Sequence, residues 1–478
     1  MLQQTLLYSI ASLVSAIIGL LSAVCFTRLL SPEEYGVYVV GLSIAGVISA
    51  VLFTWVRVSA LRFQSEGGAV DVRRTALAAY FISVLAAPVA FIVVALVSGV
   101  SYPRALAAVG FALGLGLFEL GQELLKSRLQ SFAFMAASIT RACLAFLLCL
   151  VAASLGGGGL GQLAMVALTY FITATIFAAV IWRGPMAPFN VIELRQFARF
   201  GVPITVSGFV FAIHAALDRM LVFYLMGDAA AGHYGASADL VRQIILIPAT
   251  SIAAATIPLA VRAFANGGER EARQHLELSF EILLAVIIPA VVGFALTSNF
   301  VANIILGSEY RETAAQILPI LAFAWLFQSI TQSYVHVSFH LAKRPFLITL
   351  QGIGMLLANL ITMPILTIQF GLPGAAWALV ITELFGMSLG WVLARRAFPL
   401  PFNAWHVLRI CLATLSMALV LAGLKLMLPA GWLSFCIIVA SGCATYIAAA
   451  LALDIAGLRK SLGVLRRRDR LAVSRQII

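Results

Sequence analysis

The stretch LLSPEEYGVY (Leu29–Tyr38) separates two long apolar runs, and its outline returns later in the chain as LMGDAAAGHY (Leu225–Tyr234). An alignment without gaps makes three positions identical: Leu29 with Leu225, Gly36 with Gly232, and Tyr38 with Tyr234. The first copy joins the first apolar run to the second, and the second copy joins the seventh to the eighth. If every run crosses a membrane, both copies begin on the same side of it. This predicts a duplicated, parallel arrangement of the kind found in transporters.

The first copy also has the features of a helix start. Ser31 and Pro32 are suited to the turn, and Glu33 and Glu34 fall where the positive end of the next helix favours carboxylates. A simple turn between two helices explains these residues without any repeat. The two interpretations are compatible.

Composition identifies a membrane protein. Of 478 residues, 62% are hydrophobic and 10% are charged, against about 25% charged in ordinary soluble domains. A spanning helix needs about 20 mainly apolar residues. The sequence predicts an all-α polytopic protein with fourteen spans, at residues 6–28, 37–61, 75–99, 105–126, 131–155, 160–182, 201–226, 232–261, 276–298, 313–341, 346–368, 373–394, 407–428 and 432–455.

Basic residues predict the orientation, because short cytoplasmic loops carry positive charge. With the N-terminus inside, most of the 31 lysines and arginines fall on cytoplasmic segments. The opposite side receives Arg104, Arg311 and Lys425. Both termini are therefore expected in the cytoplasm. The expected division is a six-helix lobe (1–183), a cytoplasmic linker (184–199), a second six-helix lobe (200–397), two further helices (398–455) and a basic tail (456–478).

The net charge of +12 lies mainly on the predicted inner loops and tail, where anionic membrane lipids explain it better than nucleic acid does. The six cysteines lie in apolar segments without Cys-x-x-Cys spacing, which is typical of packing residues. His336 and His340 share a helix face, but no third metal ligand is near them in the sequence. We expect no metal and no cofactor.

Two motifs resemble a known family. RLLSPEEYGVY after a first span, together with DRMLVFYLMGDAAAGHYGASADLVRQ (Asp218–Gln243), resembles the polysaccharide export proteins. These are the O-antigen (Wzx-type) flippases of the multidrug/oligosaccharidyl-lipid/polysaccharide exporter superfamily, and the length and span pattern fit nearly the whole chain. The resemblance implies two six-helix lobes around a central cavity, with two additional C-terminal helices.

The same resemblance implies a function. It is the movement of an undecaprenyl-diphosphate-linked oligosaccharide from the inner to the outer leaflet of the bacterial inner membrane by alternating access, for O-antigen, capsule or exopolysaccharide assembly. Polysaccharide polymerases and other assembly proteins would be partners. The related lipid II flippases place a cationic residue directly after an Ala-Asp pair in the eighth helix. Here Leu240 follows Ala238-Asp239, and the arginine is Arg242, two positions later. Two positions are about 200° around a helix, so Arg242 does not take the direction of that cationic residue.

Five arginines fall inside predicted spans: Arg28, Arg57, Arg141, Arg219 and Arg242. Charges facing lipid cost about 2.5 to 17 kcal/mol, so such groups usually face protein or a hydrated cavity. Guanidinium groups bind diphosphate oxygens in pairs and stay charged. We expect Arg28, Arg57, Arg219 and Arg242 to bind the diphosphate. Snorkelling to the interface is the alternative for Arg28 and Arg57, and a structural pair with Asp218 is the alternative for Arg219.

Four carboxylates are candidates for ion coupling: Asp218, Asp239, Glu119 and Glu123. Structural salt bridges are the competing interpretation, with Asp239 near Arg242, Glu123 near Lys126, and Glu119 within reach of Arg141 on the next span. Glu383, in the middle of the twelfth span, has no assigned partner or role. The coupling energy could be the membrane potential, protons or sodium.

Other functions fit less well. A membrane polymerase or ligase would need substantial outer segments, but the longest expected outer loop, Asn299–Glu312, is short. Drug or cation efflux by the same fold would favour acidic cavity residues, whereas arginines are more prominent here. Prolines at Pro248 and Pro258 predict a kinked eighth helix that lines the cavity, with a static kink as the alternative. We therefore expect a transporter and not an enzyme.

Overall fold

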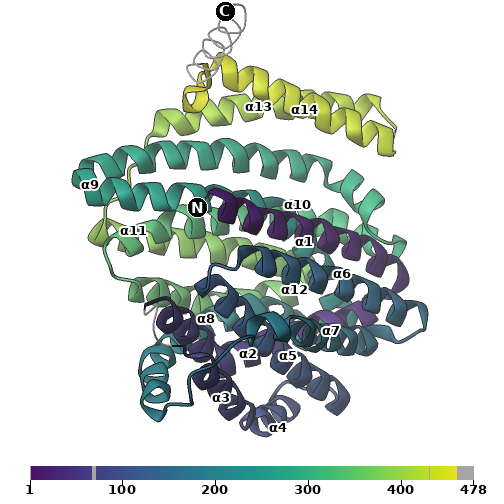
Figure 1. Cartoon of the computed structure of the whole chain (residues 1–478). Helices are drawn as coiled ribbons and strands as arrows, with labels where there is room; N and C mark the ends of the chain where they lie inside the picture. Colours follow the sequence, from purple (N-terminus) through teal and green to yellow (C-terminus); the bar gives the residue numbers. More distant parts are fainter. Residues whose placement is uncertain (1, 67–70, 430, 460–478) are drawn as a thin grey trace, which may run out of the picture. The chain divides into compact units, whose positions relative to one another are not determined.

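The computed structural model describes residues 2–66, 71–429 and 431–459, and over these ranges the chain is helical, without strands (Figure 1). Its helices are α1 (Leu2–Leu29), α2 (Pro32–Glu66), α3 (Arg73–Val84), α4 (Ala87–Val97), α5 (Tyr102–Ser127), α6 (Ser131–Ser154), α7 (Gly158–Ile181), α8 (Val191–Met226), α9 (Asp228–Ile305), α10 (Arg311–Ile330), α11 (His336–Leu341), α12 (Phe346–Ala397), α13 (Ala404–Met427) and α14 (Trp432–Ala452). The all-α polytopic class predicted from the sequence is confirmed. Most of the predicted basic tail lies outside the described residues.

Twelve helical segments of the described chain are long and apolar enough to cross a membrane. Two of them, α9 and α12, contain a glycine in a non-helical conformation, Gly268 (φ 71°) and Gly371 (φ 64°). Glycine adopts positive φ without the steric penalty of a side chain. Each glycine falls between two predicted spans, so each long helix contains both of them. The count of fourteen crossings stays a prediction.

Proline and capping residues explain two further boundaries. The predicted third span divides into α3 and α4 at Leu85–Ala86, and Pro88 lies in the first turn of α4, where its missing N–H is tolerated. Helix α8 begins inside the predicted linker 184–199, because the side chain of Asn190 accepts a hydrogen bond from the N–H of Ile192. In α9 the helix is continuous through Pro248 and Pro258, and its break is at Gly268.

The chain forms two compact units, which we describe separately. Unit 1 contains residues 1–243, 305–313 and 352–379, and unit 2 contains residues 244–304, 314–351 and 380–478. These units differ from the predicted six-helix lobes, because α8 and the first turns of α9 pack with the N-terminal helices. The assignment of lobes to 1–183 and 200–397 stays a prediction.

Unit 1 is built on close packing of α2 with α5 and α8. A Cβ atom added to Gly201 of α8 would lie 2.3 Å from the carbonyl oxygen of Trp55, and one added to Gly116 of α5 would lie 2.3 Å from the ring of Phe53. Small residues allow helices to approach this closely inside a membrane, where van der Waals packing drives association. The core around Phe53 includes Tyr80, whose hydroxyl donates to the carbonyl of Leu113 (2.9 Å).

Unit 2 contains an aromatic core and a π-helical turn. The rings of Phe280 and Tyr334 stack with centroids 4.2 Å apart, and Trp391 and Phe402 pack beside them. Tyr334 belongs to the π-turn Thr331–Val335, which joins α10 to α11 within the predicted span 313–341. Single π-turns are often found at functional sites. Helices α13 and α14 pack on α9 through a cluster that includes Phe300 and Met417.

Candidate functional site: paired elbows and ion pairs

The first copy of the repeat is the elbow between α1 and α2, and it is closed by a reciprocal cap. The N–H of Ser31 donates to Oε2 of Glu34 (3.1 Å), and the N–H of Glu34 donates to Oγ of Ser31 (3.3 Å). This capping box satisfies two N–H groups that a helix start leaves without partners. The expected role of Ser31, Pro32 and Glu34 in starting the helix is confirmed.

The second copy is the elbow between α8 and α9. Gly227 turns the chain at φ 87°, and Asp228 begins α9. The carboxylate of Asp228 pairs with the guanidinium of Arg104 (2.8 Å), which also lies 5.3 Å from the ring centroid of Phe223. Arg104 is buried at the start of α5. The sequence placed it only among the outer-side charges, so its role here was missed.

The two elbows contact each other at the glycines that the repeat shares. A Cβ on Gly36 would lie 1.8 Å from the carbonyl oxygen of Asp228, and a Cβ on Gly232 would lie 1.9 Å from that of Pro32. Asp228 lies four positions before Gly232, and Pro32 lies four positions before Gly36. The contact is therefore the same when the two copies of the repeat are exchanged. The next aligned pair, Val39 and Gly235, is also in contact. The repeat therefore marks a backbone-to-backbone junction.

A short segment between α9 and α10 covers the first elbow. The N–H of Gly307 donates to Oγ1 of Thr27 (3.2 Å), and the hydroxyl of Tyr310 donates to the carbonyl of Leu30 (3.1 Å). The ring of Tyr310 also packs against Tyr35 and His233. We call the two elbows, Leu29–Gly36 and Gly227–Gly232, together with Arg104, Gly307 and Tyr310, the elbow clasp. All of it lies in unit 1.

A charged cluster lies farther along α8 and α9. The guanidinium of Arg219 pairs with Asp239 (2.5 Å), and Oδ1 of Asp218 accepts the backbone N–H of Arg219 (2.8 Å). Asp218 and His214 are buried. The expected pairing of Asp239 with Arg242 is wrong, because Arg242 is exposed on another face of α9 and Arg219 occupies Asp239. With one arginine and two aspartates, this cluster has no excess positive charge.

A second ion pair joins α2 and α5. The guanidinium of Arg57 contacts the carboxylate of Glu119 and also donates to Oγ1 of Thr54 (3.3 Å). The expected Glu119–Arg141 bridge is therefore wrong. Arg141 instead donates to the hydroxyl of Tyr170 (3.3 Å) and lies over that ring.

The local pair was predicted correctly. Nζ of Lys126 contacts Oε1 of Glu123 at 2.8 Å, one helical turn apart on α5. Among the four arginines expected to bind diphosphate, Arg57 and Arg219 thus have carboxylate partners, while Arg28 and Arg242 are exposed. Their roles, and those of the four carboxylates, stay predictions.

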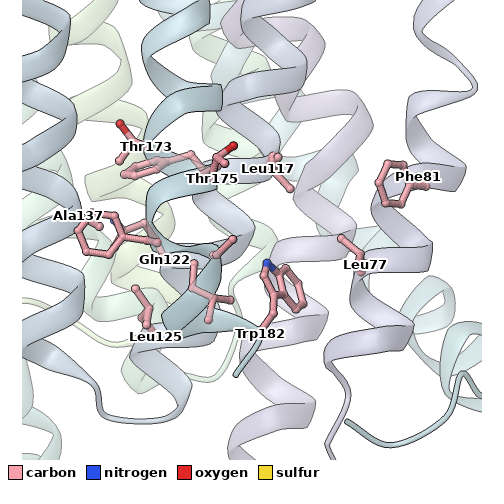
Figure 2. A pocket seen from close by; sticks show the side chains of 15 residues that line it. Leu77, Phe81, Leu117, Gln122, Leu125, Ala137, Thr173, Thr175 and Trp182 are labelled. Carbon is pink, nitrogen blue, oxygen red and sulfur yellow. The ribbon is translucent and has the colours of Figure 1, made fainter. Parts of the chain in front are cut away.

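A small pocket of about 230 Å³ lies between α3, α5, α6 and α7 (Figure 2). Figure 2 shows Gln122 among the apolar side chains of Leu125, Ala137 and Trp182. The residues lining this pocket include none with a formal charge. It is suited to an apolar group and not to a diphosphate.

Comparisons with known proteins agree with these features. Residues 25–315, which include both copies of the repeat, match the family model for polysaccharide biosynthesis protein. The chain is 23% identical over 209 residues to the lipid II flippase MurJ of Bacillus subtilis (strain 168), and 24% identical over 198 residues to a putative O-antigen transporter of Shigella flexneri. Each alignment covers 41% of this chain, and they span 38% and 46% of the two relatives.

Solved structures show the same fold. A lipid II flippase MurJ in the inward closed conformation superimposes with a TM-score of 0.77 at 16% identity, covering 94% of this chain and 99% of that one. An inward-facing MATE multidrug transporter of the MOP superfamily gives a TM-score of 0.59 at 17% identity, covering 82% and 94%. The resemblance noted from the repeat is confirmed. This multi-pass membrane protein belongs to the polysaccharide biosynthesis protein family.

Proposed function

We propose that the protein is a flippase that moves an undecaprenyl-diphosphate-linked oligosaccharide from the inner to the outer leaflet of the bacterial inner membrane. The observation that carries this proposal is the glycine contact between the two elbows. Alternating access needs a junction that is closed in one state and separated in the other. A contact made by bare backbone, related by exchange of the two copies, is suited to that role. With both termini cytoplasmic, the elbow clasp faces outward.

The ion pairs suggest how an anionic cargo would bind. A partly buried guanidinium is stabilised by a counter-charge, and here Glu119 neutralises Arg57 while Asp239 neutralises Arg219. A diphosphate binds such groups in pairs and would replace those carboxylates. In general, a carboxylate that loses its cationic partner takes up a proton more readily. Cargo binding and proton uptake would thereby be linked, with Asp218 and Glu123 beside the two pairs and Arg28 and Arg242 as further contacts.

The test is replacement of each arginine by alanine in a strain that depends on this protein for surface polysaccharide. Arg57→Ala and Arg219→Ala should reduce surface polysaccharide and cause the lipid-linked precursor to accumulate, at normal membrane levels of the protein. Arg270→Ala, at an exposed position of α9, is the matched control and should export normally. Normal export by all four arginine variants, including Arg28→Ala and Arg242→Ala, would remove the diphosphate assignment.

Lipid II is the second candidate cargo, because one relative is a lipid II flippase. The departure at Leu240 from that family's pattern speaks against it. Rescue of cells depleted of their own lipid II flippase by this protein would favour lipid II. Restored polysaccharide in an O-antigen flippase mutant, without such rescue, would favour the oligosaccharide. In the second case, a polysaccharide polymerase would act on the exported product as a partner.

A further inference from the structure

An apolar groove of about 650 Å³ lies in unit 1 between α2, α4 and α8. Each helix contributes one face, with Ile48 and Val51 from α2, Val93 from α4, and Phe209 and Leu217 from α8. The residues that line it are apolar except Ser98, at its end. None of its lining residues belongs to the elbow clasp or to the charged cluster.

The groove runs along α4, which begins directly after the break that follows α3. Helix α4 packs along α5 and leaves an apolar face toward α2 and α8 without side chains to fill it. Val89 and Val97 on this face are 61% and 75% exposed. They belong to the segment Arg73–Val97, which is long and apolar enough to cross a membrane. In a bilayer, this groove is therefore open to hydrocarbon and not to water.

Its dimensions fit an extended chain. From Ala86 to Ser98 the helical rise gives a length of about 18 Å along α4. Apolar cavities are poor sites for water, which needs polar partners. A hydrocarbon chain that lies along α4 would cover the valine face and the facing isoleucines of α2.

We propose that this groove binds the isoprenoid chain of the lipid-linked cargo, an inference that rests on the proposed function. Its walls are rich in β-branched side chains, which are stiff about χ1 and keep the groove open in advance. Binding an extended chain costs conformational entropy for every bond that becomes fixed. An isoprenoid has a double bond in each unit, so fewer bonds lose rotation than in a saturated acyl chain. A preformed groove therefore favours the isoprenoid.

The position on α8 connects this groove to the charged cluster. Leu217 and Met220 line the groove, and between them in sequence are Asp218 and Arg219. Neighbouring helical residues differ by about 100° in direction, so one helix presents the apolar face to the tail and the charged side chains to another side. An isoprenoid in the groove would thus fix the position of the helix that carries Arg219.

The test uses photolabelling of the full-length protein in lipid vesicles. One probe is undecaprenyl phosphate with a diazirine within its chain, and the other is phosphatidylcholine with a diazirine in an acyl chain. Mass spectrometry then locates the labelled peptides. The expected result is preferential labelling of α4 by the undecaprenyl probe, with competition by unlabelled undecaprenyl phosphate.

Val93→Trp fills the groove, and Leu96→Trp is the matched control on a lipid-exposed face of the same helix. Displacing two methylene-sized segments of the chain would weaken binding about tenfold, so Val93→Trp should lower undecaprenyl labelling and export while Leu96→Trp should not. Equal labelling by both probes, or full export by Val93→Trp with labelling lost, would overturn the inference. The labelling needs no sugar, so isoprenoid binding without any polysaccharide defect in the null strain would overturn the proposed function alone.

Discussion

Adding one carbon atom at Gly36 tests the elbow clasp directly. In Gly36→Ala the new methyl carbon would lie 1.8 Å from the carbonyl oxygen of Asp228, whereas ordinary contacts of a Cβ begin at 3.4 Å. The difference means that the starts of α2 and α9 must separate by about 1.6 Å, because a backbone carbonyl cannot rotate away as a side chain can. The substitution should therefore disfavour the closed clasp.

The size of the effect follows from the usual cost of overpacking. That cost is about 1–3 kcal/mol, and a change of this size shifts a two-state equilibrium about 5- to 150-fold. Gly46→Ala is the matched control, since it lies on the same helix and its added Cβ would meet nothing within 4 Å. It should leave the equilibrium unchanged, with a small gain in helix stability.

The assay is a distance measurement between spin labels at Glu33 and Ala229, two exposed residues in the first turns of α2 and α9. The labels require replacement of the six cysteines. Gly36→Ala should move the distance distribution to longer values, and export should fall because the clasp no longer closes. A distribution identical to that of the parent protein, with full export, would refute the reasoning from the glycine contact.

Three further substitutions probe the elbow clasp and the Arg57–Glu119 pair. Arg104→Ala should leave the carboxylate of Asp228 poorly compensated and lower export, and exchanging the two charges in a double variant should restore part of it in the same export assay. Arg57→Ala should destabilise the purified protein in a thermal unfolding assay. If the pair with Glu119 is only structural, a second change of Glu119→Ala should restore both stability and export. Loss of export that persists in the double variant would indicate cargo binding. Tyr310→Phe removes the hydrogen bond to the Leu30 carbonyl, which is worth about 1 kcal/mol. The ratio of the population with the longer elbow distance to the population with the shorter one should therefore rise about fivefold.

Features determined by neighbours along the chain were predictable from the sequence. The capping box at Ser31 and the Lys126–Glu123 pair both join residues three apart, so helical geometry alone brings them together. The apolar spans and the repeat also followed from composition and spacing. The breaks at Gly268 and Gly371 fall where the sequence separates two spans, although it gives no φ angle.

Contacts between helices were not predictable in the same way. Asp239 has Arg242 one turn away, but the rotation of α9 exposes Arg242 and turns Asp239 toward Arg219 of α8. Similarly, equal depth suggested Arg141 for Glu119, whereas α2 supplies Arg57. Depth in the membrane is readable from helical rise, but the direction of a side chain around its helix depends on packing with other helices.

In the proposed alternating-access cycle, the arrangement of the clasp implies that it opens as one unit. Gly36 packs on the carbonyl of Asp228, while the carboxylate of the same residue pairs with Arg104. Gly232 packs on Pro32, the first residue of α2, and Tyr310 covers other residues of the same elbow. A movement that separates one glycine from its carbonyl therefore also separates the other, and it displaces Asp228 relative to Arg104. Contacts that share residues in this way are lost together and not one after another, so intermediate separations should be sparsely populated and the spin-label distances should fall into two groups.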